Sequence, residues 1–418
     1  MSKKATDKEP AKTGVEDDGE SIGLMEPLLV SESGGRRGPL ADLALEVAQQ
    51  SARLRAGLPA GMAGALADLV RSMNCYYSNL IEGHDTHPVD IERALKADYS
   101  DDPKKRDLQL EALAHMGVQK WIDDGGLQGR AATQAGLLET HQRFCDMLPE
   151  DLLWVENPET KERIRIEPGA YRNRHVRVGA HIPVSPGAVP RFMERFEAAY
   201  GRPGKIDSIL AAATAHHRLL WIHPFIDGNG RVVRLMSYAM LRDALDTGGI
   251  WSVARGLARS VDDYKAHLAS CDQTRRNDLD GRGHLSEEAL AGFARYFLGI
   301  CLDQIAFMAS LVQPEELRNR ILLWAEEEIR ANRLPPQSGL VLEAILYRGE
   351  LPKGDVGKLL GVSERTARRI YTALIEREVL STESKHGPLR LALPASLAAR
   401  WMPGMFPDKP SQQTGQQA

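Results

Sequence analysis

The sequence predicts a mainly α-helical protein with few and short strands. Helical periodicity dominates between residues 39 and 330, and turns rich in glycine and proline separate the helical stretches. After Pro335 and Pro336 the pattern changes to three short helices and a hairpin, which indicates a separate C-terminal domain. The clearest periodic stretches are 43–56, 108–123 and 290–311.

The chain divides into five parts. Residues 1–38 mix Lys, Glu, Asp, Ser and Gly with few aromatics, and we expect them to be disordered. An N-terminal helical region is expected at 39–110 and the main helical core with flanking helices at 111–330. The C-terminal domain is expected at 335–395 and a C-terminal tail at 396–418, which we expect to be polar and unstructured after Pro403.

Composition favours a soluble protein. The formal charge of −4 over 418 residues is too close to neutral to indicate nucleic acid or membrane partners for the whole chain. The four cysteines lack paired spacing, so neither a disulfide framework nor a zinc site is indicated. We expect no apolar run to reach the length needed to span a bilayer, and the N-terminus leads into a charged stretch. We therefore expect a cytoplasmic location and no membrane partner.

The most informative stretch is residues 223–234, which reads His-Pro-Phe-Ile-Asp-Gly-Asn-Gly-Arg-Val-Val-Arg. Before it, residues 211–222 contain good helix formers without Gly or Pro. Pro224 and the Asp-Gly-Asn-Gly turn end that helix, and a second helix is expected over 231–241. A turn that opens a helix presents free backbone N–H groups and a helix dipole that favour an anion.

The side chains of this stretch indicate phosphate chemistry. Arg231 and Arg234 lie three residues apart on one helix face and can bind phosphate in a forked geometry. Asp227 can hold Mg²⁺, which prefers a carboxylate together with phosphate oxygens. His223 is then the natural proton acceptor at neutral pH. Together they predict a site for nucleotide phosphates, a metal and a base.

Simpler interpretations explain only parts of this stretch. An Asp-Gly-Asn-Gly cluster alone is usually a turn, and two arginines three apart are usually a solvated helix face. His216 and His223 lie two helical turns apart and, with Asp227, could indicate a metal hydrolase. Zinc sites normally use tighter pairs such as His-x-x-x-His. We therefore expect His216 to support the core and His217 to lie on the helix surface.

The order His-Pro-Phe-x-Asp-Gly-Asn-Gly-Arg-x-x-Arg resembles the signature of Fic-domain proteins, most of which transfer AMP from ATP to a protein hydroxyl. The resemblance implies a Fic helical core in which His223 deprotonates the hydroxyl and Asp227 holds Mg²⁺ between the α- and β-phosphates. Arg231 would bind the β-phosphate and Arg234 the γ-phosphate. The anion hole would be formed by the backbone of Gly228, Asn229 and Gly230, with the Asn229 side chain.

One residue of this stretch departs from the family pattern. Many relatives have Gly or Ala before the last arginine, where this chain has Val233. The larger side chain is expected to crowd the nucleotide.

A second motif lies upstream at Ser78-Asn-Leu-Ile-Glu82-Gly83. It ends a helical stretch over 63–81, and Gly83 is a suitable helix stop. A glutamate at a helix C-terminus gains from a cationic partner. The motif is similar to the inhibitory motif of Fic proteins, Ser/Thr-x-x-x-Glu-Gly/Asn. That resemblance implies that Glu82 pairs with Arg234 and takes the space of the γ-phosphate.

A third element follows Gly169-Ala-Tyr-Arg172, a Gly-x-x-Arg pattern that recurs in Fic relatives. Val176 and Val178 alternate with polar neighbours and Gly179 breaks the pattern, which predicts a short strand. It resembles the hairpin flap of Fic proteins, whose edge docks the target by strand addition. The docking residues would be Val176, Arg177, Val178 and Gly179. Without the resemblance, an ordinary surface hairpin is expected.

The C-terminal domain is expected to contain helices over 339–347, 353–360 and 363–378, the last with Ser363 as N-cap, and a hairpin over 382–393. This order resembles a winged helix-turn-helix. Lys and Arg exceed Asp and Glu only modestly between 353 and 390, so there is little excess positive charge to bind DNA phosphates. Protein binding therefore stays open as an alternative. The recognition helix would present Arg365, Thr366, Arg368 and Arg369.

Two classes of function follow. The first is a protein adenylyltransferase that uses Mg²⁺ and ATP and modifies a Ser, Thr or Tyr hydroxyl of an unknown protein or of the chain itself. Other nucleotide donors, or removal of AMP, stay open for such an enzyme. The second class is a regulator whose winged helix binds DNA or protein, with the core as an accessory sensor. The stretch 290–311 is expected to pack on the core or to form a homodimer contact.

Overall fold

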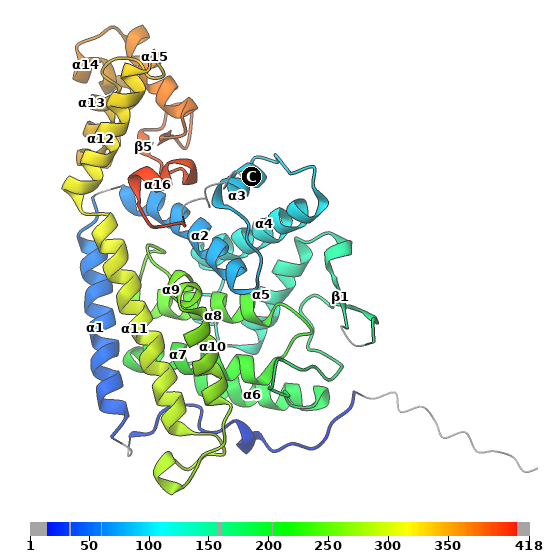
Figure 1. The fold of residues 1–418 in the computed structure, drawn as a ribbon. Helices are drawn as coiled ribbons and strands as arrows, with labels where there is room; N and C mark the ends of the chain where they lie inside the picture. The colour runs from blue at the N-terminus through cyan, green and yellow to red at the C-terminus, as the bar shows by residue number, and fades with distance from the viewer. Residues whose placement is uncertain (1–14, 33–34, 60, 158–159, 203, 408–418) are drawn as a thin grey trace, which may run out of the picture.

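The computed structural model describes residues 15–32, 35–59, 61–157, 160–202 and 204–407. The described chain is mainly helical and its strands are short, as predicted (Figure 1). A broad helical body carries a smaller domain, formed by the C-terminal part of the chain, at one end (Figure 1).

Two long helices, α1 (Arg37–Ala56) and α11 (Glu287–Leu311), pack side by side along one flank of the body (Figure 1). The central pair α7 (Lys205–Ile222) and α8 (Asn229–Leu245) pack against each other, and α7 also contacts α1 and α11. The core therefore holds both helices that flank the 223–234 stretch. The other helices of the body are α2 (Met62–Ile81), α3 (Pro88–Leu95), α4 (Pro103–Asp123), α5 (Gln134–Asp146), α6 (Val189–Tyr200), α9 (Ala254–Arg259) and α10 (Val261–Cys271).

The C-terminal domain follows α12 (Pro314–Arg330), and its short strands pair antiparallel in the order β3-β5-β4. The predicted helices and hairpin are present, with β3 as a third strand that the sequence did not indicate. Residues Ala367, Ile370 and Leu374 form the buried stripe of the third helix. The elements are α13 (Ser338–Arg348), β3 (Glu350–Leu351), α14 (Val356–Leu360), α15 (Glu364–Glu376), β4 (Leu380–Ser381) and β5 (Leu389–Leu391).

Residues 15–32, which we call the N-terminal strap, pack on the body and include a short 3₁₀ helix at Ile22–Met25. Arg191 pairs with Asp17, and Arg195 donates to the Glu26 carboxylate at 2.6 Å. The expectation of disorder over 1–38 is therefore wrong for the strap and for the start of α1. Residues 1–14 lie outside the described residues. The charged composition indicated disorder, but the charged side chains of the strap form ion pairs with residues far along the chain.

The assignment of 396–418 to a C-terminal tail, expected to be polar and unstructured after Pro403, is also wrong for the part that the structure describes. A last helix, α16 (Ala398–Trp401), packs against α12. Trp401, Met402 and Met405 are fully buried, and the Trp401 ring packs edge-to-face on Trp324 of α12. Residues 408–418 lie outside the described residues.

Helix α11 is long and apolar enough to cross a membrane by length and composition alone, which the sequence reading had excluded for the whole chain. Half of its most apolar window is buried inside the protein, and core helices of this kind pass the same test. The four cysteines are free and buried, as the absence of paired spacing predicted.

Several histidines are buried in the body as neutral side chains. Burial lowers the pKa of His115 to about 3 and the pKa of His217 to about 4. An unfolded histidine titrates near 6.5, so below that pH the unfolded chain binds protons that the folded chain does not. The free energy of unfolding should therefore fall as the pH drops from 6.5, by about 1.4 kcal/mol per pH unit for each such histidine.

We expect His115→Gln to reduce this acid sensitivity. Between pH 7 and pH 5, urea unfolding of the variant should lose about 2 kcal/mol less stability than the wild type, because one buried titration is removed. His386→Gln, in the exposed turn of the C-terminal hairpin, is the matched control. An unchanged pH dependence in His115→Gln would contradict the assignment.

Candidate functional site: the loop between α7 and α8

The loop between α7 and α8 is held by local backbone geometry. Helix α7 ends at His223, whose backbone is left-handed with φ 52° and ψ 62°. Gly228 also has positive φ, 79°, and α8 begins at Asn229, two residues before the predicted start. A left-handed residue at each end of the loop turns the chain sharply, so the N-terminus of α8 faces the end of α7.

Asn229 closes this loop with its side chain. Its Oδ1 accepts from the backbone N–H of Phe225 at 3.0 Å, and its Nδ2 donates to the Phe225 carbonyl at 2.9 Å. The amide thus holds the loop, and the expectation that this side chain adds to the anion hole stays a prediction. The contribution of the backbone at 228–230 to anion binding stays a prediction.

His223 is the predicted general base. Its burial lowers its pKa to about 4, so the imidazole is neutral at physiological pH and can accept a proton. The low pKa also makes it a weaker base than an exposed histidine, and a closely positioned hydroxyl is then required for efficient proton transfer.

The upstream motif binds the Nε and NH2 edge of Arg234. Its Nε donates to Ser78 Oγ at 2.8 Å, and its NH2 donates to the Ser78 carbonyl at 3.1 Å and to Glu82 Oε1 at 2.5 Å. All three acceptors lie in the last turn of α2 or at its C-cap, the negative end of the helix dipole. The pairing of Glu82 with Arg234, which the resemblance implied, is thus present in the described fold.

The carboxylate of Glu82 lies over the first turn of α8. A β-carbon at residue 230 would lie 2.2 Å from Glu82 Oε1, so only glycine fits there while the carboxylate is in place. Burial opposes ionisation of Glu82, but the attraction and hydrogen bond of Arg234 outweigh it and lower the pKa. Glu82 therefore stays charged at neutral pH and faces the helix N-terminus as an anion would. Gly83 follows with φ 87°, which makes it the predicted helix stop.

Arg231 has a carboxylate partner that the sequence reading missed. Its NH2 donates to Asp227 Oδ2 at 3.0 Å, and its NH1 lies 3.4 Å from Glu111 Oε2 on α4. His84 Nδ1 lies 2.7 Å from the same Glu111 oxygen, and this contact raises the pKa of His84. The sequence did contain a signal for this partner: Glu111 lies one turn before His115, on a face of α4 that is otherwise mostly apolar.

Asp227 fits its predicted role as a metal ligand. Its side chain is about half exposed, at 45%, and only one carboxylate oxygen is used, by Arg231. Mg²⁺ usually takes one or two protein carboxylates and completes its shell with phosphate oxygens and water. A single accessible carboxylate beside the N-terminus of α8 suits such a nucleotide-bound metal.

The alternative of a metal hydrolase is not supported, because His216 is not available as a metal ligand. His216 uses both ring nitrogens inside the core, at 2.8 Å from Ser237 Oγ and 2.7 Å from Tyr264 OH. It is a core residue, as expected. His217 is corrected, because it is buried rather than on the surface, and it contacts Asp272 at 3.0 Å and Arg218 at 2.6 Å.

The predicted flap is smaller than a strand. Residues 176–178 contain one isolated bridge, in which Val178 and His181 exchange backbone hydrogen bonds of 3.0 Å around Gly179. A regular hairpin lies upstream instead, where β1 (Trp154–Glu156) pairs with β2 (Arg163–Arg165). The strand is thus reduced to a tight turn with an exposed edge, where Val178 is 43% exposed.

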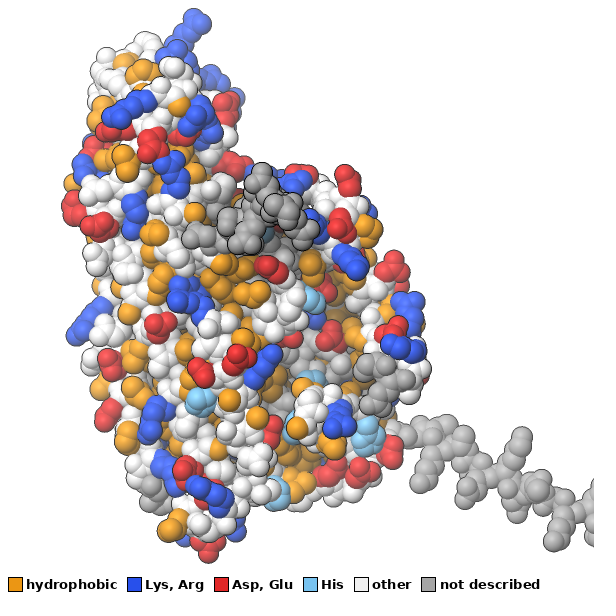
Figure 2. Space-filling view, in the orientation of Figure 1, with side chains coloured by type: hydrophobic (Ala, Val, Ile, Leu, Met, Phe, Trp, Pro, Cys, Tyr) orange, Lys and Arg blue, Asp and Glu red, His pale blue; other side chains and the backbone are white. Residues whose placement is uncertain are grey.

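The predicted recognition helix corresponds to α15. Ser363 caps it by accepting from the Thr366 backbone N–H at 3.3 Å, as predicted. Arg365, Arg368 and Arg369 are exposed, and none of them pairs with a carboxylate of the described residues. Over the visible face of this domain, acidic and basic side chains are interspersed (Figure 2).

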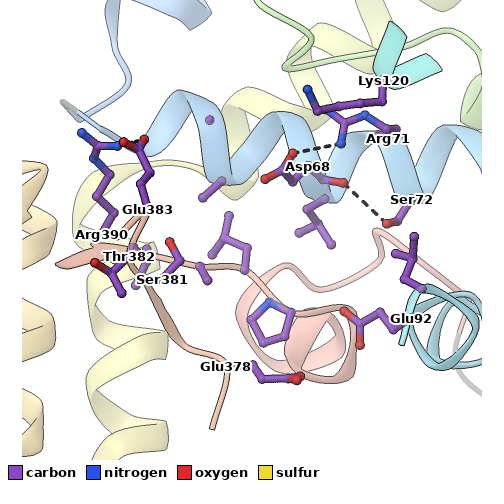
Figure 3. A pocket seen from close by; sticks show the side chains of 18 of the residues that line it. Asp68, Arg71, Ser72, Glu92, Lys120, Glu378, Ser381, Thr382, Glu383 and Arg390 are labelled. Carbon is purple, nitrogen blue, oxygen red and sulfur yellow. Dashed lines mark hydrogen bonds and ion pairs between the residues drawn. The ribbon is translucent and has the colours of Figure 1, made fainter. Parts of the chain in front are cut away.

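A cleft of about 1320 Å³ separates α2 and α4 from the C-terminal strands (Figure 3). Its charged side chains are mostly paired with one another. Arg71 pairs with Asp68, and Arg390 pairs with Glu350 and Glu383. The cleft lies along the N-terminal half of α2, away from the end of this helix that carries the upstream motif. It is therefore a joint between the two parts of the molecule and separate from the loop of His223.

Comparison with known proteins agrees with this geometry. Residues 132–241, which include the whole α7–α8 loop, match the model of the Fic/DOC family. This part of the chain is therefore similar to the Fic/DOC family domain. Helix α2 and the C-terminal domain lie outside the matched residues.

Curated relatives match the same part of the chain. The protein adenylyltransferases Fic of Drosophila grimshawi and Drosophila mojavensis are each 32% identical to this chain over 171 residues, or 40% of it. Those residues span only about a third of the relatives' length, 32% and 31%.

Solved structures give similar matches. A Fic family protein from Desulfovibrio desulfuricans covers 84% of this chain with 18% identity and a TM-score of 0.45. A Fic domain containing signaling protein from Bacteroides thetaiotaomicron covers 64% with 17% identity and a TM-score of 0.46.

Proposed function

We propose that the protein is an adenylyltransferase that moves AMP from Mg-ATP to a Ser, Thr or Tyr hydroxyl of a protein. The convergence of His223, Asp227 and two arginines on the N-terminus of α8 carries this proposal. The Fic/DOC match over the same residues and the adenylyltransferase relatives support it.

In the proposed reaction, His223 accepts the proton of the target hydroxyl as its oxygen bonds to the α-phosphorus of ATP. The bond from the α-phosphorus to the bridging oxygen breaks, and pyrophosphate leaves. Arg231, Arg234 and the backbone N–H groups of α8 stabilise the phosphate charge, which is the main task of a protein in such transfers. A Mg²⁺ ion held by Asp227 would neutralise further phosphate charge.

We further propose that the wild-type chain is autoinhibited. Glu82 occupies the guanidinium of Arg234, which a γ-phosphate would otherwise bind. Ser78 takes two further donors of this guanidinium, at Nε and NH2, so the edge of Arg234 that carries these atoms is held by the end of α2. The test is whether Glu82→Gly protein incorporates label from ATP labelled at the α-phosphorus but not at the γ-phosphorus. Incorporation from the γ-position alone would overturn AMP transfer as the activity.

A second candidate function concerns the C-terminal domain, for which we propose a winged helix-turn-helix that binds duplex DNA. The three exposed and unpaired arginines of α15 favour it, since a helix that enters the major groove needs such donors.

We expect binding to a duplex in fluorescence anisotropy at low salt that weakens steeply as salt rises, because phosphate contacts release counterions. A variant with Arg365→Gln, Arg368→Gln and Arg369→Gln should reduce the affinity by about tenfold or more. Arg330→Gln on α12, an exposed site outside this domain, is the control. Absence of binding at low salt would favour a protein partner instead.

A further inference from the structure

Arg172 is a buried arginine, 2% exposed, that pairs with no carboxylate of the described residues. Its guanidinium is satisfied by backbone carbonyls alone. Burial lowers its pKa to about 10, so it stays charged at neutral pH. A buried charge held only by carbonyls is costly unless its hydrogen bonds are well placed, which makes their positions informative.

Two of these carbonyls, and a third that accepts from the backbone N–H of Arg172, belong to consecutive residues of the loop that carries the base. Arg172 Nε donates to the His223 carbonyl at 2.8 Å, and NH2 lies 3.4 Å from the Ile222 carbonyl. The backbone N–H of Arg172 donates to the Pro224 carbonyl at 2.8 Å. Residues 222–224, which we call the base loop, are therefore fixed to a single residue at every carbonyl.

These bonds act on a strained backbone. A non-glycine residue in the left-handed region costs of order 1–3 kcal/mol and persists only where its surroundings determine it. Arg172 holds the carbonyls on both sides of His223, and so it fixes the φ and ψ values that aim the imidazole.

The same guanidinium holds the flap. NH1 donates to the Arg174 carbonyl at 3.0 Å, and NH2 also donates to the Val184 carbonyl. Arg174 and Val184 are the two ends of residues 174–184, the flap segment that contains the Val178–His181 turn. One planar group thus connects the base loop with both ends of the segment expected to present the target.

The N-terminal strap supports this arrangement from outside. The Glu20 carboxylate accepts from the backbone N–H and the hydroxyl of Ser185, each at 2.6 Å. Ser185 directly follows Val184, so the strap fixes the end of the flap segment that Arg172 holds.

We propose that Arg172 is a positioning residue that sets the distance and angle between His223 and the target hydroxyl held on the flap segment. The inference rests on the proposed function, since it assigns Arg172 to the proton-transfer step of that reaction. Lysine cannot replace it, because one ammonium nitrogen cannot span carbonyls that a forked guanidinium reaches.

The test uses Arg172→Lys and Arg172→Ala in a Glu82→Gly background. We expect kcat for AMP transfer to fall about 100-fold in each, since a small misplacement of reacting groups costs about that much. The Kd for ATP should stay within about twofold, because the phosphate-binding groups of α8 are untouched. Guanidinium ion at tens of millimolar should restore part of the rate of Arg172→Ala but not of Arg172→Lys.

Hydrogen exchange gives a readout that does not depend on activity. Both variants should exchange faster at the amides of residues 174–184 and of Ile222 and His223 than the parent, while the rest of α7 and α8 stays protected. Arg165→Lys, an exposed arginine on β2 bonded only to carboxylates, is the matched control for both measurements.

The outcomes separate the two proposals. If the Glu82→Gly parent transfers no AMP, the proposed function fails, and hydrogen exchange alone decides whether Arg172 locks the two segments. If the parent is active and Arg172→Lys transfers at the parental rate, the positioning role is overturned. A lower rate accompanied by weaker ATP binding, a lower Tm and no guanidinium rescue would also overturn it, because the effect would then be general destabilisation.

Discussion

Glu82→Gly should raise the incorporation of AMP from α-labelled ATP by at least about tenfold over the wild type. The substitution frees the Arg234 guanidinium, and a charged hydrogen bond of this kind is worth about 1.5–3 kcal/mol. It also clears the first turn of α8, where the Glu82 carboxylate now lies against Gly230. Gel autoradiography with the protein itself as acceptor, followed by mass spectrometry of candidate targets, measures the change.

Two control variants distinguish loss of the Glu82–Arg234 pair from a general destabilisation of the fold. Glu46→Gly on the exposed face of α1 introduces the same residue into a helix without touching Arg234. It should leave labelling at the wild-type level. Glu82→Gln keeps the size but removes the charge, and intermediate labelling is expected. Equal labelling of wild type and Glu82→Gly would show that the Glu82–Arg234 pair does not limit transfer.

His223→Ala in the Glu82→Gly background should lower the transfer rate by about 10² to 10⁴, the usual contribution of a general base. ATP binding measured by calorimetry should change little, because His223 holds no phosphate in the proposed reaction. The same assay at varied pH should show the parental rate nearly constant from pH 8 to pH 5. The base is deprotonated above its pKa of about 4, so the acid limb appears only near that value.

His267→Ala, on α10 and stacked on Tyr296, is the control for loss of a histidine as such. Retained transfer in His223→Ala would remove the base from the mechanism while leaving nucleotide binding by α8 in place.

The sequence predicted helix ends accurately where glycine or a capping residue lies at the boundary. The stretch 63–81 differs from α2 by one residue at its start, because Gly61 and Gly83 mark both ends with positive φ. The helices of the C-terminal domain were predicted for the same reason, with Gly349, Gly361 and the Ser363 cap between them.

The same patterns could not reveal contacts made at long range. The N-terminal strap has the composition of a disordered segment, but distant partners order it: arginines pair with its carboxylates, and Met25, Leu28 and Val30 are buried in the core. Glu111 was missed because its pairing with Arg231 depends on how α4 packs on α8. For Asn229 the motif indicated a side chain that binds the ligand. In the fold, the amide forms hydrogen bonds with the Phe225 backbone within the loop.

Val233 shows how packing decides the meaning of a substitution. The sequence suggested that its side chain crowds the nucleotide. Its side chain is fully buried in the hydrophobic core and has no exposed surface to offer a ligand. The departure from the family pattern therefore adds core volume on the inner face of α8 and leaves the outer face of the helix unchanged.

The position of the strap in the sequence also determines when it can dock during synthesis. Glu26 and its partner Arg195 are 169 residues apart in the chain. At ribosomal rates of about 5–20 residues per second, the strap waits roughly 10–30 s for the surface on which it docks. Throughout that interval it is a charged and extended segment open to proteases and chaperones. The outer support of the flap is thus made well before the surface on which it docks.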